Sequence, residues 1–388
     1  MKIADIQVYP LGYVREQPTP FTRSFALVKV TTDAGLHGWG EASDCFGHSN
    51  PLVIQQVVEE EMKRHLLGKD PLLLEQHLQA FRQWVYPTLG LAGAVTQALS
   101  AVDIALWDIR GQALGQPVSR LLGHYRDQVA VYAAGTIAFD RAPDWHAAFF
   151  EPLLQRGCTT VKLRLGRSLR WDTELVRSVR ELLGDEIDII ADAKYNYTLP
   201  TAIRLAAALE ACDVLYLEEP LPEYHLEAIA QLAAQTSLPL AYGEHTYTVH
   251  GFRELIDHDV AIFQPDATVV GGLHEARKVA ALAEAWGRAV SPHCGGLSAV
   301  GIAANVHLSA STPTFTVLEY DATPTQPMRD LIVHGRPFSP ERIVSGCLAA
   351  PAAPGLGVEV DEAALADFAY RPRSHKLDTP PSYATPHL

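Results

Sequence analysis

The first third of the chain begins with apolar stretches that alternate with polar residues at the period of a β-strand. An Asp-Ala-Gly turn signal at residues 33–35 separates the second stretch from the third, which is typical of antiparallel strands joined by a tight turn. The expected strands are residues 2–11, 24–33 and 36–42.

Helix-period segments follow these strands. In the longest of them apolar residues recur at i, i+3 and i+4 between Ala98 and Leu106, which predicts a helix with one apolar face. Gly115 and Pro117 are expected to end it. The predicted helices lie near residues 50–66, 71–84 and 92–114.

From about residue 130, short apolar strands alternate with helix-period segments. Eight strands with helical crossovers over roughly 190 residues predict an α/β fold in which a parallel sheet closes into a barrel. An open, doubly wound sheet is the alternative, but it needs a glycine-rich turn after its first strand. The sequence there, AAGTIAFD at 133–140, has a single glycine, so the barrel is preferred. The eight expected strands are residues 129–135, 159–166, 187–193, 214–220, 238–244, 261–266, 289–293 and 315–320.

Composition narrows the class of protein. The chain has 388 residues, of which 48% are hydrophobic and 20% charged, as in an ordinary globular protein. It has no run of 18 apolar residues and no apolar leader at its start, so we expect neither a membrane span nor secretion. Five scattered cysteines without a CxxC pair fit a reducing cytoplasm. The net charge of −14, without a basic stripe, argues against a nucleic-acid partner.

Carboxylates stand at the ends of three consecutive barrel strands. Glu218 follows Asp192 by 26 residues, and Glu244 follows Glu218 by 26, so one strand–helix unit separates each acid from the next. Strand ends converge at the active face of a barrel. Three adjacent carboxylates repel unless a cation neutralises them, and oxygen ligands with open positions suit Mg²⁺. The alternative, favoured for any one acid alone, is helix capping or pairing with Lys or Arg.

A second pair of residues suggests acid–base chemistry. His293 follows Asp266 by 27 residues, again about one strand–helix unit. An aspartate beside a histidine fixes its tautomer and stabilises the imidazolium. A structural histidine is the alternative, but a neighbouring metal site favours the catalytic role.

The stretch VKLRLG at 161–166 places two cations in an otherwise apolar strand. Because side chains alternate along a strand, Lys162 and Arg164 share one side and should face the barrel interior near Asp192. Lys194 would share that side with Asp192 if the strand continues so far. A buried structural salt bridge is the alternative for Lys162.

Taken in order, these motifs resemble the enolase superfamily, in the branch of mandelate racemase and the acid-sugar dehydratases. The matching stretches are GWGEA, VKLRLG, ADAKYNY, LEEP, GEH, QPD, SPHCGG and LEYD. The resemblance implies a modified TIM barrel, (β/α)₇β, under an α+β capping domain formed by the N-terminal part and the C-terminal tail. The implied divisions are a capping domain at 1–125, the barrel at 126–345 and a returning segment at 346–388.

The resemblance also implies roles for individual residues. Asp192, Glu218 and Glu244 would bind Mg²⁺, which chelates the carboxylate of a small-molecule substrate, and the proton α to that carboxylate would be removed. Glu319, if protonated, would donate a hydrogen bond to the substrate carboxylate, or else anchor a loop. Substrate choice would lie in cap loops. In those loops, Phe46 and His48 are candidates for contact with the substrate. His245 is a candidate at the mouth of the barrel, and packing is an equal alternative for it. Relatives are often dimers or octamers, so a homo-oligomer is expected.

Two residues depart from the family pattern. Arg164 stands where a lysine base is usual, and arginine stays protonated at ordinary pH. A symmetrical two-base racemase is therefore disfavoured. Lys194 stands where many relatives have asparagine, and it would either transfer a proton or hold a substrate hydroxyl or carboxylate; the sequence leaves both open.

The leading hypothesis is a Mg²⁺-dependent dehydratase that converts a sugar acid into a 2-keto-3-deoxy acid. His293, held by Asp266, would transfer protons, while Lys162, Arg164 and Lys194 would stabilise the enediolate. A lactone cycloisomerase or a racemase/epimerase is the alternative with related chemistry. A non-catalytic sugar-acid binder is the alternative from another class, and the complete set of acids argues against it.

Overall fold

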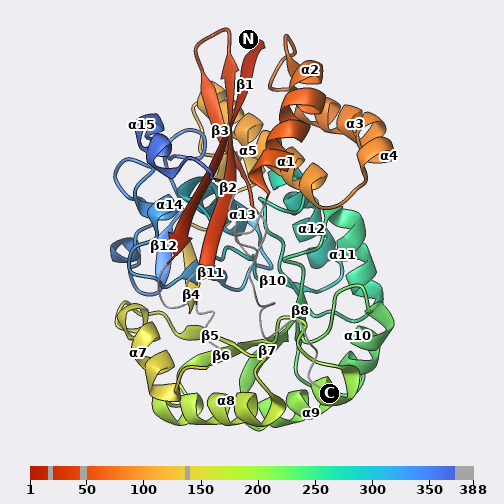
Figure 1. Cartoon of the computed structure of the whole chain (residues 1–388), viewed down its shortest axis with the longest axis vertical. Coiled ribbons are helices and arrows are strands. Elements are labelled where there is room, and N and C mark those ends of the chain that lie inside the picture. The colour runs from red at the N-terminus through yellow and green to blue at the C-terminus, as the bar shows by residue number, and fades with distance from the viewer. Residues whose placement is uncertain (16–20, 44–49, 136–139, 372–388) are drawn as a thin grey trace.

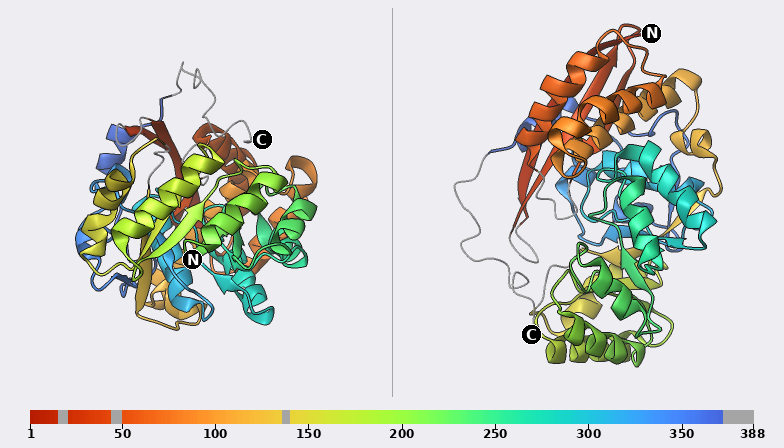
Figure 2. Two further views of the ribbon diagram at one scale, coloured as in Figure 1. Left: turned by 90° about the horizontal axis from the view of Figure 1, so that it is seen from below. Right: turned by 90° about the vertical axis from the view of Figure 1, so that its right-hand side faces the viewer.

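The computed structural model describes residues 1–15, 21–43, 50–135 and 140–371. A layer of strands and helices from the N-terminal part covers one end of a barrel (Figures 1 and 2). Phe46 and His48, expected from the sequence to select the substrate, lie outside the described residues. In the described part of the chain, no helix is both long and apolar enough to cross a membrane.

The N-terminal sheet has the three antiparallel strands that the sequence predicts, in the order β1-β2-β3. They are β1 (Ile3–Arg15), β2 (Phe21–Thr32) and β3 (His37–Ala42). The helices that follow are α1 (Pro51–Gln56), the π-helical segment η1 (Val57–Met62), α2 (Lys63–Leu66), α3 (Leu74–Trp84), α4 (Tyr86–Leu89), α5 (Ala94–Leu114) and α6 (Val118–Leu122).

Helix α5 packs directly on β3 because two glycines allow a close approach. A Cβ atom at Gly40 would lie 1.8 Å from the carbonyl oxygen of Ala101, and one at Gly38 would lie 2.2 Å from that of Ala105. The helix ends at Leu114, before Gly115 in a left-handed conformation (φ 64°), as predicted.

Eight parallel strands form the barrel and confirm the predicted architecture. Their order along the sheet is β10-β9-β8-β7-β6-β5-β4-β11. A bridge between Val290 of β10 and Phe315, just before β11, closes the circle. The strands are β4 (Gln128–Ala134), β5 (Thr160–Arg164), β6 (Asp188–Asp192), β7 (Val214–Glu218), β8 (Leu240–Tyr242), β9 (Ile262–Phe263), β10 (Ala289–Val290) and β11 (Leu318–Asp321).

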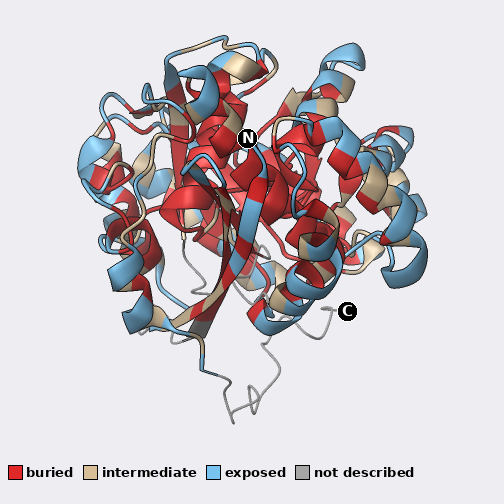
Figure 3. Ribbon diagram, turned by 90° about the horizontal axis from the view of Figure 1, so that it is seen from above, coloured by how far each residue is buried: buried red, intermediate tan, exposed pale blue. Residues whose placement is uncertain are grey.

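A helix follows each of the first seven barrel strands, which gives the (β/α)₇β arrangement. Buried residues fill the centre and exposed residues lie on the outer helix surfaces (Figure 3). In α8, for example, Leu175, Val176 and Val179 are buried at helical spacing. These helices are α7 (Pro143–Leu154), α8 (Leu169–Leu183), α9 (Leu199–Glu210), α10 (Leu226–Ala233), α11 (Thr248–Asp257), α12 (Gly272–Ala285) and α13 (Ala299–Ser311).

After the barrel the chain runs back to the N-terminal sheet. Strand β12 pairs antiparallel with β4, and a bridge joins Ala369 to Leu11 of β1. This segment contains α14 (Pro327–Asp330), the 3₁₀ turn η2 (Pro340–Arg342), β12 (Cys347–Ala349), α15 (Glu362–Leu365) and the 3₁₀ turn η3 (Ala366–Phe368).

Candidate active site

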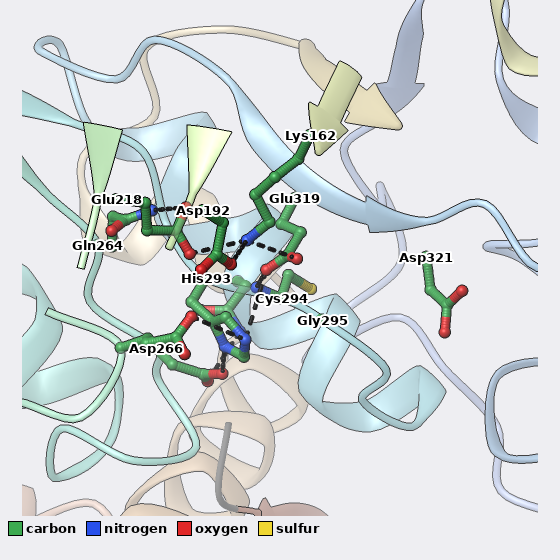
Figure 4. A network of polar contacts seen from close by, with 12 residues as sticks. Lys162, Asp192, Glu218, Gln264, Asp266, His293, Cys294, Gly295, Glu319 and Asp321 are labelled. Carbon is green, nitrogen blue, oxygen red and sulfur yellow. Dashed lines mark hydrogen bonds and ion pairs between the residues drawn. The ribbon is translucent and has the colours of Figure 1, made fainter. Parts of the chain in front are cut away.

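Three carboxylates meet at the carboxyl ends of neighbouring barrel strands. Asp192 ends β6 and lies opposite Glu218, which ends β7, and Glu244 follows β8 by two residues. Each offers an oxygen within 4.8 Å of the oxygens of the other two. All three are buried. The structure thus brings together the acids that the 26-residue spacing placed side by side (Figure 4 labels Asp192 and Glu218).

The chemistry of these oxygens fits a hard divalent cation. Within the described residues, neither oxygen of Asp192 nor of Glu244 accepts a hydrogen bond, although all four atoms are buried. Burial and the charge of Asp192 raise the pKa of Glu218 well above its usual value, so the neighbouring side-chain cations do not fully neutralise three ionised acids. Mg²⁺, which prefers carboxylate oxygens and keeps open positions, is suited to this set.

Lys162 and Arg164 both point into this cluster, as strand alternation predicts. The Nζ atom of Lys162 lies 2.8 Å from Glu218 Oε1, 3.0 Å from Glu319 Oε1 and 3.4 Å from Asp192 Oδ2 (Figure 4). Arg164 forms an ion pair with Asp192. Burial opposes the charged form of Lys162, but these carboxylates outweigh it and raise the lysine pKa well above its usual value. Lys162 is therefore a protonated ammonium.

Lys194 reaches the cluster by a different route from the one expected. Strand β6 ends at Asp192, and Lys194 and Tyr195 adopt left-handed conformations with φ of 45° and 62°. The strand-alternation argument therefore does not apply to Lys194. The turn still directs its Nζ atom to 3.7 Å from Glu244 Oε1.

The Asp–His pair lies against the same cluster. His293 Nδ1 is 2.8 Å from Asp266 Oδ2. The second oxygen, Asp266 Oδ1, accepts bonds from the Thr268 N–H (2.8 Å) and hydroxyl (2.7 Å). It also accepts a 3.1 Å bond from the Asn305 amide. An aspartate so bonded is an acceptor, so Nδ1 of His293 carries a proton in either charge state of the ring and Nε2 faces the site.

The Nε2 atom of His293 is surrounded by carboxylates. It lies 3.5 Å from Glu244 Oε2 and 3.4 Å from Glu319 Oε2. Burial lowers the pKa of this imidazole, but Glu319 and Glu244 outweigh burial and raise the pKa to about 9. The charge of the imidazole is therefore coupled to the charges of Glu244 and Glu319.

Glu319, in β11, contacts both Lys162 and the loop that carries His293. Its Oε2 accepts a 3.2 Å bond from the Cys294 N–H, which is a loop-anchoring contact. Burial raises its pKa, but Lys162 and His293 outweigh burial and leave the pKa of Glu319 below its usual value. These surroundings favour the carboxylate form.

His245 lies at the edge of the cluster with its own partners. Its Nδ1 is 3.1 Å from Glu219 Oε1 and hydrogen bonded to the Tyr195 hydroxyl. Its side chain is 21% exposed, which leaves part of the ring accessible. Burial lowers the pKa of His245 to about 4, so the ring is neutral at ordinary pH.

Several supporting residues were not singled out from the sequence. Gln264 donates a 2.8 Å bond to Glu218 Oε2, and the Tyr132 ring lies 5.6 Å from Lys162 Nζ. Glu219 and Gln264 lie within the LEEP and QPD motifs, so the sequence could have pointed to them as site residues. Asn305 lies in the middle of a helix and has no such signal.

Two family models match most of the chain. Residues 146–364 match the family described as "Enolase C-terminal domain-like". Residues 14–123 match "Mandelate racemase / muconate lactonizing enzyme, N-terminal domain". These two matches cover more than half of the chain.

Individual relatives agree with this placement. The D-galactarolactone cycloisomerase of Agrobacterium fabrum is 30% identical over 95% of this chain and 99% of its own length. A D-galactonate dehydratase family member of Streptomyces bingchenggensis is 32% identical over 90% of this chain and 91% of its own length. Other relatives of similar identity are also named sugar-acid dehydratases, which are hydro-lyases.

A solved structure shows the same fold. The mandelate racemase/muconate lactonizing protein from Paracoccus denitrificans PD1222, complexed with magnesium, superposes with a TM-score of 0.84 at 31% identity. The match covers 95% of this chain and 96% of that one. Together with the (β/α)₇β barrel, the capping sheet and the ordered motifs, these matches show that the chain belongs to the enolase superfamily, in its mandelate racemase-like branch.

Proposed function

We propose that this protein is a Mg²⁺-dependent dehydratase that converts a sugar acid, such as an aldonate or aldarate, into a 2-keto-3-deoxy acid. One observation carries the proposal: three carboxylates suited to Mg²⁺ and a His–Asp pair share the same buried strand ends. The relatives named sugar-acid dehydratases support the reaction class.

Asp192, Glu218 and Glu244 would hold the metal. A bound Mg²⁺ supplies Lewis-acid polarisation of the substrate carboxylate and so acidifies the C2 proton. The two strand cations add positive charge where the enediolate develops, because Lys162 is held as an ammonium and Arg164 stays protonated. Neither is suited to accept a proton.

Proton transfer then falls to His293. Glu244 is one of the charges that hold His293 protonated, so a metal bound to Glu244 would favour loss of the Nε2 proton. With Nδ1–H donated to Asp266, the neutral ring then presents a lone pair on Nε2. We assign Nε2 to remove the C2 proton as the C2–H electrons pass into the enediolate. When the enediolate collapses, C2=C3 forms, the C3–O bond breaks, and the imidazolium protonates the departing oxygen as water. The enol product then tautomerises to the 2-keto acid, so the balance is loss of one water.

A lactone cycloisomerase is the second candidate, because one relative with almost complete coverage bears that name. Both reactions can begin with removal of a proton α to a carbonyl carbon. They differ in whether water leaves the substrate. Deuterium entering unreacted substrate in D₂O, without keto-acid formation, would exclude the dehydratase.

A substrate screen tests the proposal. Purified protein is incubated with a library of acid sugars, with Mg²⁺ or with EDTA, and 2-keto acids are detected with semicarbazide. We expect at least one sugar acid to give a Mg²⁺-dependent signal. No signal across the aldonates and aldarates would contradict the proposal.

A further inference from the structure

A carboxylate of the capping domain reaches into the barrel at the start of helix α13. Glu41, in β3, is fully buried. Its Oε1 accepts a 3.1 Å bond from the Ser298 N–H, and its Oε2 accepts a 2.8 Å bond from the Gly301 N–H. The Ser298 hydroxyl also donates to Oε2. The first amides of a helix have no partner within the helix, so an acceptor here fixes where α13 begins.

The backbone is shaped to admit this carboxylate. A Cβ atom at Gly301 would lie 2.7 Å from Glu41 Oε2 and 3.0 Å from the Thr268 methyl carbon. Thr268 in turn donates two bonds to Asp266. Glycine at 301 therefore allows the cap, the helix and the segment that carries Asp266 to pack in direct contact.

One turn further along, α13 holds the aspartate of the His–Asp pair. The Asn305 amide donates a 3.1 Å bond to Asp266 Oδ1, while its own oxygen accepts a 3.0 Å bond from the Ala267 N–H. Both Asn305 and Asp266 are fully buried. Hydrogen bonds and the backbone of α13 thus connect Glu41 to Asp266 and His293.

The loop that carries His293 ends at the same point. Residues 291–298 connect β10 to α13, so the Glu41 contact at Ser298 fixes the far end of this loop. Gln326 holds the loop from its other side, with bonds of 3.1 Å to the Gly296 carbonyl and 2.9 Å to that of Leu297. A displacement of α13 would therefore change the direction of the imidazole both through its partner Asp266 and through its own backbone.

We propose that Glu41 is a positioning residue for His293, through which docking of the capping domain sets the orientation of the proton-transfer group. Its effect on rate rests on the proposed function, whereas its effect on the His293–Asp266 hydrogen bond does not. A displacement of about 1 Å can lower a rate by about 100-fold. We therefore expect Glu41→Gln to lower kcat by about 10- to 100-fold with KM and Mg²⁺ affinity nearly unchanged.

Asp108→Asn is the matched control. Asp108 is also a buried carboxylate that accepts two backbone bonds, from Trp39 (3.0 Å) and from Leu356 (2.9 Å). These partners lie in β3 and in the C-terminal segment rather than at α13. Its replacement should lower stability but leave the kcat of the folded enzyme within about threefold. Equal kcat losses in the two variants would overturn the proposal, as would an unchanged kcat for Glu41→Gln.

A second readout does not need a substrate. With ¹⁵N-labelled histidine, the Nδ1–H signal of His293 is assigned by its loss in His293→Gln. We expect this proton to be protected from solvent exchange in the wild type and in Asp108→Asn, and to exchange at least tenfold faster in Glu41→Gln. Unchanged exchange in Glu41→Gln would refute the positioning role, even if no sugar acid is ever dehydrated.

Asn305→Asp provides the same test if Glu41→Gln does not fold. It removes the amide donor to Asp266 and leaves the cap contact in place. Loss of Nδ1–H protection in this variant supports the route through α13, and retained protection refutes that route.

Discussion

Replacing Lys162 by methionine should destabilise the metal-free protein by about 3–5 kcal/mol, the usual range when one partner of a buried ion pair is removed. The ammonium lies 2.8, 3.0 and 3.4 Å from three carboxylates. At an effective dielectric constant of about 20, one such pair contributes about 5 kcal/mol of attraction, and desolvation of the charges offsets much of it. Methionine keeps a similar length and volume, so loss of charge rather than a cavity dominates.

The assay is urea unfolding of the EDTA-treated protein, followed by a second titration in saturating Mg²⁺. Lys29→Met is the control, because Lys29 pairs with Glu362 where the glutamate side chain is 44% exposed, and such pairs contribute at most about 1 kcal/mol. In the variant, the carboxylates lack the positive charge of Lys162, and Mg²⁺ would replace it. We therefore expect the variant to gain more stability from Mg²⁺ than the wild type does. Two results would refute this electrostatic account. One is an equal loss of unfolding free energy in the two lysine variants, and the other is an equal gain from Mg²⁺ in Lys162→Met and the wild type.

Three other predictions follow from the structure. Asp192→Asn should weaken Mg²⁺ binding at least tenfold in calorimetry, because one oxygen ligand of three loses its charge; unchanged affinity would place the metal elsewhere. His293→Asn should lower kcat at least 10³-fold while Mg²⁺ affinity stays within about threefold, and retained turnover would exclude His293 as the proton-transfer group. Asp103, in α5, is buried against the start of α12, where it accepts a 3.0 Å bond from the His274 N–H, and burial raises its pKa from 3.8 to about 7. The folded protein therefore binds more protons than the unfolded chain between these values, so stability should fall by up to about 4 kcal/mol as pH rises from about 4 to 7. Asp103→Asn should flatten that slope in urea titrations, and an unchanged slope would contradict it.

The barrel and the position of its acids could be predicted because local periodicity encodes both. Strand alternation alone places Lys162 and Arg164 on the interior side, and the structure pairs both with Asp192. The spacing of one strand–helix unit places Glu218 and Glu244 beside that acid. These features repeat along the chain, so a sequence pattern can report them.

Contacts between distant segments carry no such periodic signal. Glu41 and Ser298 are separated by 257 residues, and Asp103 and His274 by 171. Strand alternation could not predict the direction of the Lys194 side chain, because the strand ends two residues before it and the chain turns through a left-handed conformation. Side-chain partners of this kind depend on how the cap docks on the barrel, which only the folded arrangement shows.

Mass spectrometry of the reaction in D₂O tests the central claim most directly. The sugar acid found in the screen is incubated with the Mg²⁺-loaded wild type and with His293→Asn. The account predicts a product that has lost one water and carries deuterium at C3, formed by the wild type and reduced at least 10³-fold in the variant. Deuterium exchange at C2 without loss of water, or equal product from both proteins, would contradict it.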